Sequence, residues 1–292
     1  MDGSGNNPLE TNADIASHVS GFVGDDQFFF FASVSRVWRH VWRDRPRETR
    51  AVTPHTSARQ LLCSFENGLA RRRGGGGGSG VCKAIARLGK LDLLKLARAV
   101  GCSWDKHTCW KAAVGGHLDF LRWARENGCP WDILTCAGAA THGHLDVLQW
   151  ARAHGAPWNE WTCTGAAKGG HLHVLQWARA HGCPWNAWTC SKAARGGHVN
   201  ILQWALANGC PLDEDVCWGA SCGGNLDVLQ WARARGCPWN ERTCSGAAVG
   251  GHLEVLQWAR ENGCPWDKST CAGAEREGHL HVLRWARANG CD

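Results

Sequence analysis

Cysteine and histidine are the residues of this chain with most scope for chemistry, because its 292 residues include 17 cysteines and 15 histidines. One recurring pattern separates two cysteines by six residues, as in Cys129 and Cys136, and another separates two histidines by one residue, as in His142 and His144. Zinc sites commonly use Cys-x2-Cys, which the sequence lacks. We therefore interpret the cysteines as small apolar core residues and predict no metal and no cofactor, with a metal or redox module as the alternative.

One string could hold a nucleophilic serine. Gly219-Ala-Ser-Cys-Gly223 has the form G-x-S-x-G, a motif that requires a bend between a strand and a helix. The string falls at the end of a predicted helix of the repeat described below, so that context is missing. The glycines of Gly74–Gly78 are not followed by the Gly-Lys-Ser/Thr of a phosphate-binding loop. We predict that the chain is not an enzyme.

Charge and hydropathy exclude other classes of function. The net charge is +6, and ten arginines are concentrated in residues 36–73. A nucleic-acid-binding protein usually presents a coherent basic face, so we expect no nucleic-acid partner. The longest apolar run, Phe28–Ala32, is far shorter than the roughly 20 residues of a membrane-spanning helix, and residues 1–14 lack the apolar segment of a secretory signal. With so many thiols, we expect an intracellular protein, cytoplasmic or nuclear or both, with no membrane partner.

A repeat of 27 residues organises the chain from residue 81 to residue 292. Eight units follow one another without insertion, and a glycine closes each of them. The closing glycines are Gly101, Gly128, Gly155, Gly182, Gly209, Gly236, Gly263 and Gly290. A histidine recurs at His117, His144, His171, His198, His252 and His279, while Lys90 and Asn225 occupy the same position in the other two units.

Each unit predicts a pair of helices. In one unit, Asp132 is a favourable N-cap for a helix over residues 133–141, and the chain breaks around Gly143. A second helix is predicted over residues 145–154 because its apolar residues share one face. It ends at Gly155, which adopts a left-handed backbone without cost. Other N-cap positions hold Asp or Asn as well: Asp105, Asn159, Asn186, Asp213, Asn240 and Asp267.

Tryptophan and cysteine bracket each N-cap. Trp131 precedes Asp132, and Cys136 lies four residues after it, which are the two positions of a hydrophobic staple. Leu212 replaces the tryptophan in one unit while Cys217 is kept. Packing explains both residues without any chemical role.

The unit resembles an ankyrin repeat. Residues Thr135–Trp150 read Thr-Cys-Ala-Gly-Ala-Ala-Thr-His-Gly-His-Leu-Asp-Val-Leu-Gln-Trp, which contains the Ala-Ala-x-x-Gly-His step of that family, and Gly143 precedes Gly155 by the family's twelve residues. The period is 27 rather than 33, and the shortfall lies before Thr162, where an ankyrin β-hairpin finger would lie. The resemblance implies an all-α solenoid of eight stacked ankyrin-like helical hairpins, and it leaves the finger open.

The segment of residues 15–45 resembles an F-box. Val34-Ser-Arg-Val-Trp-Arg39 matches the last element of that family, and the apolar spacing before it predicts short helices. The resemblance implies a small helical domain that docks on the small adaptor of a cullin–RING ubiquitin ligase; a helical cap on the first repeat is the alternative. The adaptor-binding residues would be Ile15, Val19, Phe22, Val34 and Trp38.

The sequence thus predicts four parts and a binding function. Residues 1–14 are predicted to be disordered, 15–45 form the F-box-like segment, 46–80 form a connector with a poly-glycine linker, and 81–292 form the array. The predicted function is protein binding by the repeats, with the F-box-like segment recruiting the ligase adaptor. A stand-alone scaffold without a role in ubiquitin transfer is the alternative.

The repeats themselves indicate where a protein target binds. Most positions barely change from unit to unit, whereas the two residues after each N-cap and the end of the first helix vary freely. Packing does not dictate these residues, and tryptophan and arginine are favoured anchors of interfaces; tolerated surface residues are the alternative. The predicted target-binding residues are Trp110, Trp161, Trp188, Trp218, Arg195 and Arg242.

Overall fold

The computed structural model describes residues 79–99 and 101–291. The predicted disordered segment, the F-box-like segment and the connector up to residue 78 lie outside them. Within this described part, every regular element is an α-helix, and none combines the length and apolarity needed to cross a bilayer. The helices pair into eight hairpins: α4 (Ser79–Leu88) with α5 (Leu91–Ala99), α6 (Lys106–Val114) with α7 (Leu118–Glu126), α8 (Ile133–Thr141) with α9 (Leu145–Ala153), α10 (Glu160–Gly169) with α11 (Leu172–Ala180), α12 (Ala187–Arg195) with α13 (Val199–Ala207), α14 (Glu214–Cys222) with α15 (Leu226–Arg233), α16 (Glu241–Gly250) with α17 (Leu253–Glu261), and α18 (Lys268–Arg276) with α19 (Leu280–Ala288).

The predicted helix limits are confirmed almost to the residue. Helix α8 has the predicted bounds, and α9 ends at Ala153, one residue earlier than predicted, because the chain already turns at His154 before the left-handed Gly155 (φ +83°). Residues 154–159 then join α9 to α10 without a strand. The ankyrin finger is therefore absent from this connection.

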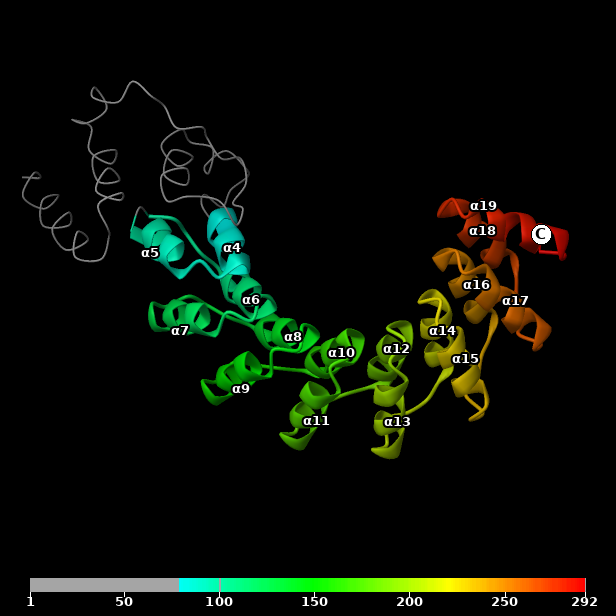
Figure 1. Ribbon diagram of the computed structural model, residues 1–292, viewed down its shortest axis with the longest axis horizontal. Helices are drawn as coiled ribbons and strands as arrows, with labels where there is room; N and C mark the ends of the chain where they lie inside the picture. Colours follow the sequence, from blue (N-terminus) through cyan, green and yellow to red (C-terminus); the bar gives the residue numbers. More distant parts are fainter. Residues whose placement is uncertain (1–78, 100, 292) are drawn as a thin grey trace, which may run out of the picture.

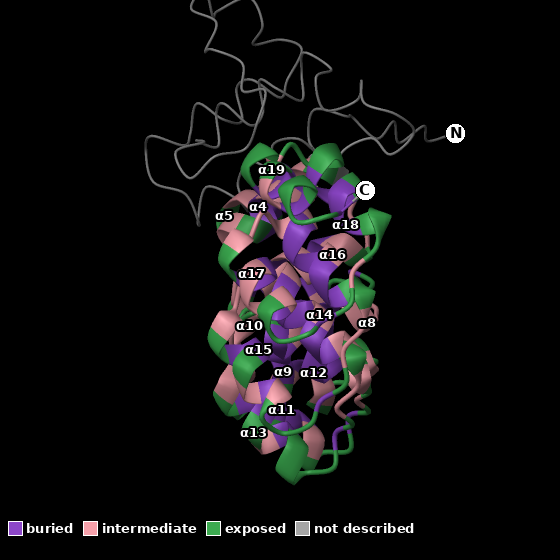
Figure 2. Cartoon of the chain, turned by 90° about the vertical axis from the view of Figure 1, so that its right-hand side faces the viewer, coloured by how far each residue is buried: buried purple, intermediate pink, exposed green. Residues whose placement is uncertain are grey.

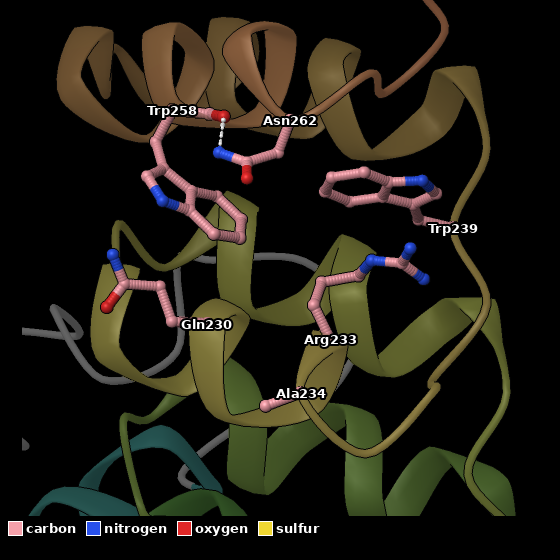
Figure 3. Close-up of a pocket in the computed structure, with 6 residues that line it drawn as sticks. All are labelled: Gln230, Arg233, Ala234, Trp239, Trp258 and Asn262. Carbon is pink, nitrogen blue, oxygen red and sulfur yellow. Dashed lines mark hydrogen bonds between the residues drawn. The ribbon is translucent and has the colours of Figure 1, made fainter.

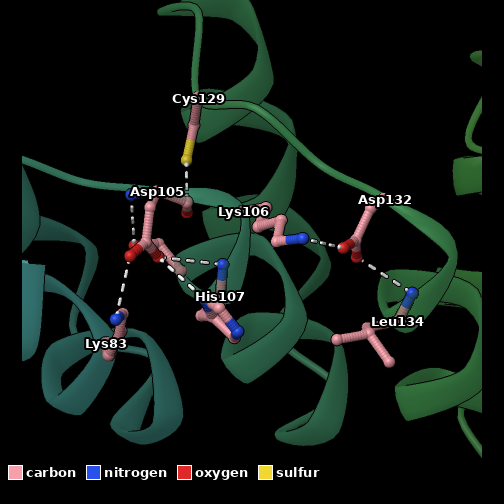
Figure 4. A network of polar contacts seen from close by, with 8 residues as sticks. Lys83, Asp105, Lys106, His107, Cys129, Asp132 and Leu134 are labelled. Atoms are coloured by element: carbon pink, nitrogen blue, oxygen red, sulfur yellow. Dashed lines mark hydrogen bonds and ion pairs between the residues drawn. The ribbon is translucent and has the colours of Figure 1, made fainter.

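The N-caps follow the sequence pattern. The Asp132 carboxylate accepts a hydrogen bond from the Leu134 N–H (3.0 Å) and also pairs with the Lys106 ammonium of the preceding unit (3.0 Å; Figure 4). The same cap is present at five further positions, whereas Asn186 has the extended backbone of a cap and no side-chain hydrogen bond. An acceptor here satisfies an N–H that the helix leaves free.

The hairpins stack into an arc with two layers of helices (Figure 1). The even-numbered helices, α4 to α18, lie on the inner side of the arc and pack on one another from unit to unit, and each odd-numbered helix packs on the outside of its own partner. Both layers contribute buried residues to the core (Figure 2). We call the exposed surface of the even-numbered helices the inner face and that of the odd-numbered helices the outer face.

Small residues allow the inner helices to approach closely. Ala139 and Ala140 of α8 are fully buried, and Val147 and Leu148 of α9 close the core from the outer layer. A Cβ atom on Gly219 would lie 2.3 Å from the Ser191 carbonyl oxygen of the preceding inner helix. Because burial of apolar surface stabilises by roughly 25 cal/mol per Å² and each hairpin has little of its own, the hairpins stabilise one another through these contacts.

The Gly-His step joins neighbouring units. The His144 ring nitrogen Nε2 lies 3.2 Å from the Val114 carbonyl oxygen at the end of the preceding inner helix, and the same ring lies against Gly116, where a Cβ would come within 2.6 Å of it. Asn225 replaces the histidine and donates to the Arg195 carbonyl at 2.9 Å. The side chain at this position thus caps the C-terminal end of the inner helix in the unit before it.

The outer face carries a second junction, which we call the Arg–Trp–Trp clamp. The guanidinium of Arg125 on α7 lies 4.1 Å from the ring centroid of Trp131, whose other partner is Trp150 on α9 at 5.9 Å in an edge-to-face arrangement. Trp131 packs against the core that contains Cys136, so the staple position also serves this clamp. The same two contacts recur in five further sets of residues: Arg98, Trp104 and Trp123; Arg152, Trp158 and Trp177; Arg179, Trp185 and Trp204; Arg233, Trp239 and Trp258; and Arg260, Trp266 and Trp285.

Candidate binding surface on the inner face

Two tryptophans stand out on the inner face because they are exposed. Trp161 on α10 is 60% exposed and Trp188 on α12 is 44% exposed. Each is the second residue of its helix, so the two lie in the same row of neighbouring units. Large apolar side chains exposed together are typical of interaction surfaces.

Trp188 belongs to a group that spans three inner helices. Its ring lies 6.2 Å from that of Trp218 on α14, at 90°, and the Lys192 ammonium lies 5.0 Å from the Trp188 ring centroid and 6.0 Å from that of Trp218. On the other side, the Arg242 guanidinium of α16 lies 4.9 Å from the Trp218 ring and 2.7 Å from an Asp215 carboxylate oxygen. We call Trp188, Lys192, Asp215, Trp218 and Arg242 the inner-face cluster.

The positive charge of the cluster is only partly balanced. Asp215 pairs with Arg242, whereas no carboxylate of the described residues lies within 4.0 Å of Lys168, Lys192 or Arg195. Burial lowers the pKa of Lys192, and the cations Arg195 and Lys168 lower it further. Several cations therefore share this part of the inner face with exposed indole rings.

The predicted target-binding residues are brought together in part. Trp188, Trp218 and Arg242 meet in the cluster, and Arg195 lies exposed at the end of α12. Trp110 is remote from them: it lies on α6 with the Lys111 ammonium 4.1 Å from its ring, and its ring packs where a Cβ of Gly138 would be.

Lys192 was missed by the sequence reasoning, although a signal was present. It lies seven residues after Trp185, and the equivalent position of most other 27-residue units holds glycine. Because most units fold with glycine at this position, packing does not require a lysine there. The glycines at this position are Gly138, Gly165, Gly219, Gly246 and Gly273.

Most cysteines of the described residues occur as pairs inside the units; Cys136 and Cys222 stand outside the pairs. The Cys190 sulfur lies 2.8 Å from that of Cys210, and the Cys183 sulfur lies 3.4 Å from the Asn159 carbonyl oxygen. The hydrogen bond to Cys210 and burial raise the pKa of the Cys190 thiol. No group of three or more His, Cys, Asp or Glu side chains within residues 79–99 and 101–291 is arranged to hold a metal ion. The pairs are part of the core, as the structural interpretation requires.

Ser221, the candidate nucleophile, lies in a packed helix. Ser221 lies within α14 and is fully buried among the residues that pack against the neighbouring helices. The strand and sharp bend of the G-x-S-x-G motif are absent at this place. We assign no chemistry to this serine.

A pocket of about 290 Å³ lies on the outer face between α15 and α17 (Figure 3). Arg233 lies 4.1 Å from the Trp239 ring, and that ring lies 6.0 Å from Trp258. Arg233, Trp239 and Trp258 thus contact one another as one Arg–Trp–Trp clamp, and we interpret the pocket as the space beside that clamp. The lining residues are Gln230, Arg233, Ala234, Trp239, Trp258 and Asn262.

Comparison with known proteins finds a match to ankyrin repeats in one part of this chain. A family model described as ankyrin repeats (many copies) matches residues 134–177, which lie within α8 to α11. The crystal structure of the human ASB11 ankyrin repeat domain is similar at 17% sequence identity with a TM-score of 0.43, and the alignment covers 54% of this chain and 84% of that one. No curated protein matches the chain.

Proposed function

We propose that the chain is a non-enzymatic interaction scaffold that holds a protein target on the inner face of α10 to α16. The observation that supports this most directly is that Trp161 and Trp188 are exposed in the same row of neighbouring units, with the Lys192 ammonium 5.0 Å from the Trp188 ring centroid. Tryptophan, tyrosine and arginine are enriched among the interface residues that contribute most of the binding energy, which makes them frequent anchors of binding. Trp161, Trp188, Trp218, Arg195 and Arg242 are the proposed contacts, and Trp110 belongs to a separate part of the same face.

The chain offers a matched control for this proposal. Its described residues contain four exposed large apolar side chains, two on the inner face and two, Leu206 and Leu280, on the outer face. We expect the double variant Trp161→Ala/Trp188→Ala to lose most of the proteins that the full chain captures from cell extract, as identified by mass spectrometry. The variant Leu206→Ala/Leu280→Ala should keep them, with helicity unchanged in both. Equal capture by all three proteins would contradict the proposal.

We further propose that residues 15–45 recruit a cullin–RING ubiquitin ligase adaptor. The support is the sequence Val34-Ser-Arg-Val-Trp-Arg39, with Ile15, Val19, Phe22, Val34 and Trp38 as docking residues. A pulldown with the purified adaptor is the test. We expect binding by the full chain and loss of binding on deletion of residues 1–45; a chain that never binds the adaptor would instead be a stand-alone scaffold.

A further inference from the structure

We infer that the inner face of α10 to α14 binds an acidic peptide segment, whose carboxylates pair with Lys168, Lys192 and Arg195 beside the rings of Trp161 and Trp188. The inference rests on the proposed function and adds the chemistry of the partner. Three separate features of the surface carry it: cations with no carboxylate partner among the described residues, the position of the acids, and access to the Lys192 ammonium beside two rings.

The first feature is that these cations have no carboxylate partner among residues 79–99 and 101–291. Lys168 and Arg195 are exposed in the last turns of α10 and α12, and Lys192 lies one turn before Arg195. No carboxylate of the described residues reaches any of them within 4.0 Å. Cations at helix C-termini are favoured by the helix dipole by only about 0.3–1 kcal/mol, so their mutual repulsion leaves a surface that gains from an added carboxylate.

The second feature is the separation of charge along the inner helices. The acids of this region stand at the other end: Glu160, Glu214 and Glu241 are the first residues of α10, α14 and α16. Asp215 follows Glu214, and Arg242 holds it. An acidic segment is therefore attracted to the ends of α10 and α12 and repelled from the beginnings of α10, α14 and α16, which gives it one preferred position.

The third feature is access to Lys192. The residues in the same row of the neighbouring inner helices are Gly165 and Gly219, which have no side chain to cover its ammonium. The rings of Trp188 and Trp218 lie beneath that ammonium at 5.0 and 6.0 Å. A carboxylate placed there would pair with a lysine already held in position by two rings, and apolar neighbours of the carboxylate would contact the exposed edges of Trp188 and Trp161.

A library of random 12-residue peptides displayed on phage is the probe for this inference. Selection on the full chain should enrich peptides in which Asp or Glu stands next to apolar residues. The affinity of the most enriched peptide, measured by fluorescence anisotropy, should fall by about tenfold in Lys192→Gln/Arg195→Gln, because two desolvated ion pairs are lost, and should fall as salt rises.

The matched control removes one lysine and one arginine from the outer face. Lys95→Gln/Arg284→Gln has the same net charge as the test variant, and both residues are exposed on outer helices. We expect it to bind within about twofold of the unaltered chain. Equal losses in the two variants, enrichment of peptides without acidic residues, no enrichment, or tighter binding of a thymidine 12-mer than of the peptide would each overturn the inference.

Failure of this inference is distinguishable from failure of the proposed function. If Trp161→Ala/Trp188→Ala abolishes capture of targets while Lys192→Gln/Arg195→Gln and high salt leave it unchanged, the binding surface stands and the acidic partner is wrong. If neither double variant affects capture, the proposed function itself is wrong.

Discussion

Cys136 illustrates a cysteine that serves packing, because its buried environment suppresses the acidity of its thiol. Cys136 lies at the fourth position of α8 and is fully buried, and its counterpart in the following connection is Ala156, so it stands outside the pairs. Burial raises the pKa of the Cys136 thiol to about 12, against an ordinary value of 9.0. A protonated, inaccessible thiol is a poor nucleophile and a poor metal ligand.

This shift predicts how Cys136 affects stability at high pH. Its pKa is higher in the folded chain than in the unfolded chain, so its contribution to stability is complete below pH 9 and is lost as the pH rises towards 12. Between pH 7 and pH 10 the loss from this one thiol is about 1.4 kcal/mol. Urea unfolding at pH 7 and pH 10 measures the loss of stability in the unaltered chain and in Cys136→Ala. The loss should be smaller in the variant by about 1.4 kcal/mol, because the variant lacks this thiol. An equal loss in both proteins would contradict the raised pKa of Cys136.

The histidines of the Gly-His step act as hydrogen-bonding groups between units. Removing the ring in His144→Ala leaves the Val114 carbonyl oxygen without its partner, and we expect a loss of about 1–3 kcal/mol in the free energy of unfolding. His144→Asn should retain most of the stability, because Asn225 already performs this role in another unit. Chemical denaturation distinguishes the two variants, and equal losses would show that ring packing, rather than the hydrogen bond, is what matters.

At the scale of the helices, the junctions between units differ in strength. Six of the described junctions have the complete Arg–Trp–Trp clamp, with a cation–π contact and an aromatic pair. The junction between α13 and α15 has Leu206 and Leu212 at the arginine and first tryptophan positions, and Trp231 is instead covered by Arg235 of its own helix end, 4.3 Å from its ring. Because the arginine and the first tryptophan are both replaced by leucine, this junction has neither the cation–π contact nor the aromatic pair.

Restoring the clamp should strengthen that junction. We expect Leu206→Arg with Leu212→Trp to raise the free energy of unfolding by about 1–2 kcal/mol, since cation–π and aromatic pairs each contribute about 0.5–1.5 kcal/mol. The single variants are the control, because neither completes the clamp. Urea unfolding of all four proteins gives the coupling energy, and a value near zero would show that the clamp contributes nothing beyond apolar burial.

At the scale of the whole molecule, the array behaves as a one-dimensional stack. Each hairpin contacts its own unit and its neighbours, so stability is a sum of unit and junction contributions. Curvature follows from this arrangement, because the inner helices approach through Ala and Gly whereas the outer helices are held apart by the bulky clamps (Figure 1). The inner face is therefore one continuous surface built from every unit.

Removal of one whole period should leave the rest of the stack intact. Deletion of residues 133–159 joins Asp132 to Glu160, so that Asp132 caps α10 in place of Asn159. We expect a folded array whose circular dichroism and urea m-value fall in proportion to the residues removed. Deletion of residues 133–152, which breaks the period, is the control and should unfold the neighbouring units; similar stability of both deletions would contradict the modular description.

Local structure was predictable from the sequence because its causes are local. The N-cap Asp132, the break at Gly143 and the left-handed Gly155 each act within a few residues, so α8 and α9 followed directly from the pattern. Repetition strengthened this prediction, since a position that keeps its residue type in every unit must serve the common fold. Repetition also exposed the variable residues, among them Trp188 and Arg242.

Only the tertiary structure decided which of these residues meet. His144 reaches a carbonyl 30 residues earlier, Cys190 meets Cys210 across its own hairpin, and Trp131 lies between helices of two units. The contacts of Lys192 with the rings of Trp188 and Trp218 likewise appear only in the tertiary structure. Such contacts depend on the tilt and curvature with which one hairpin stacks on the next, and the spacing of residues within a 27-residue period does not contain that angle.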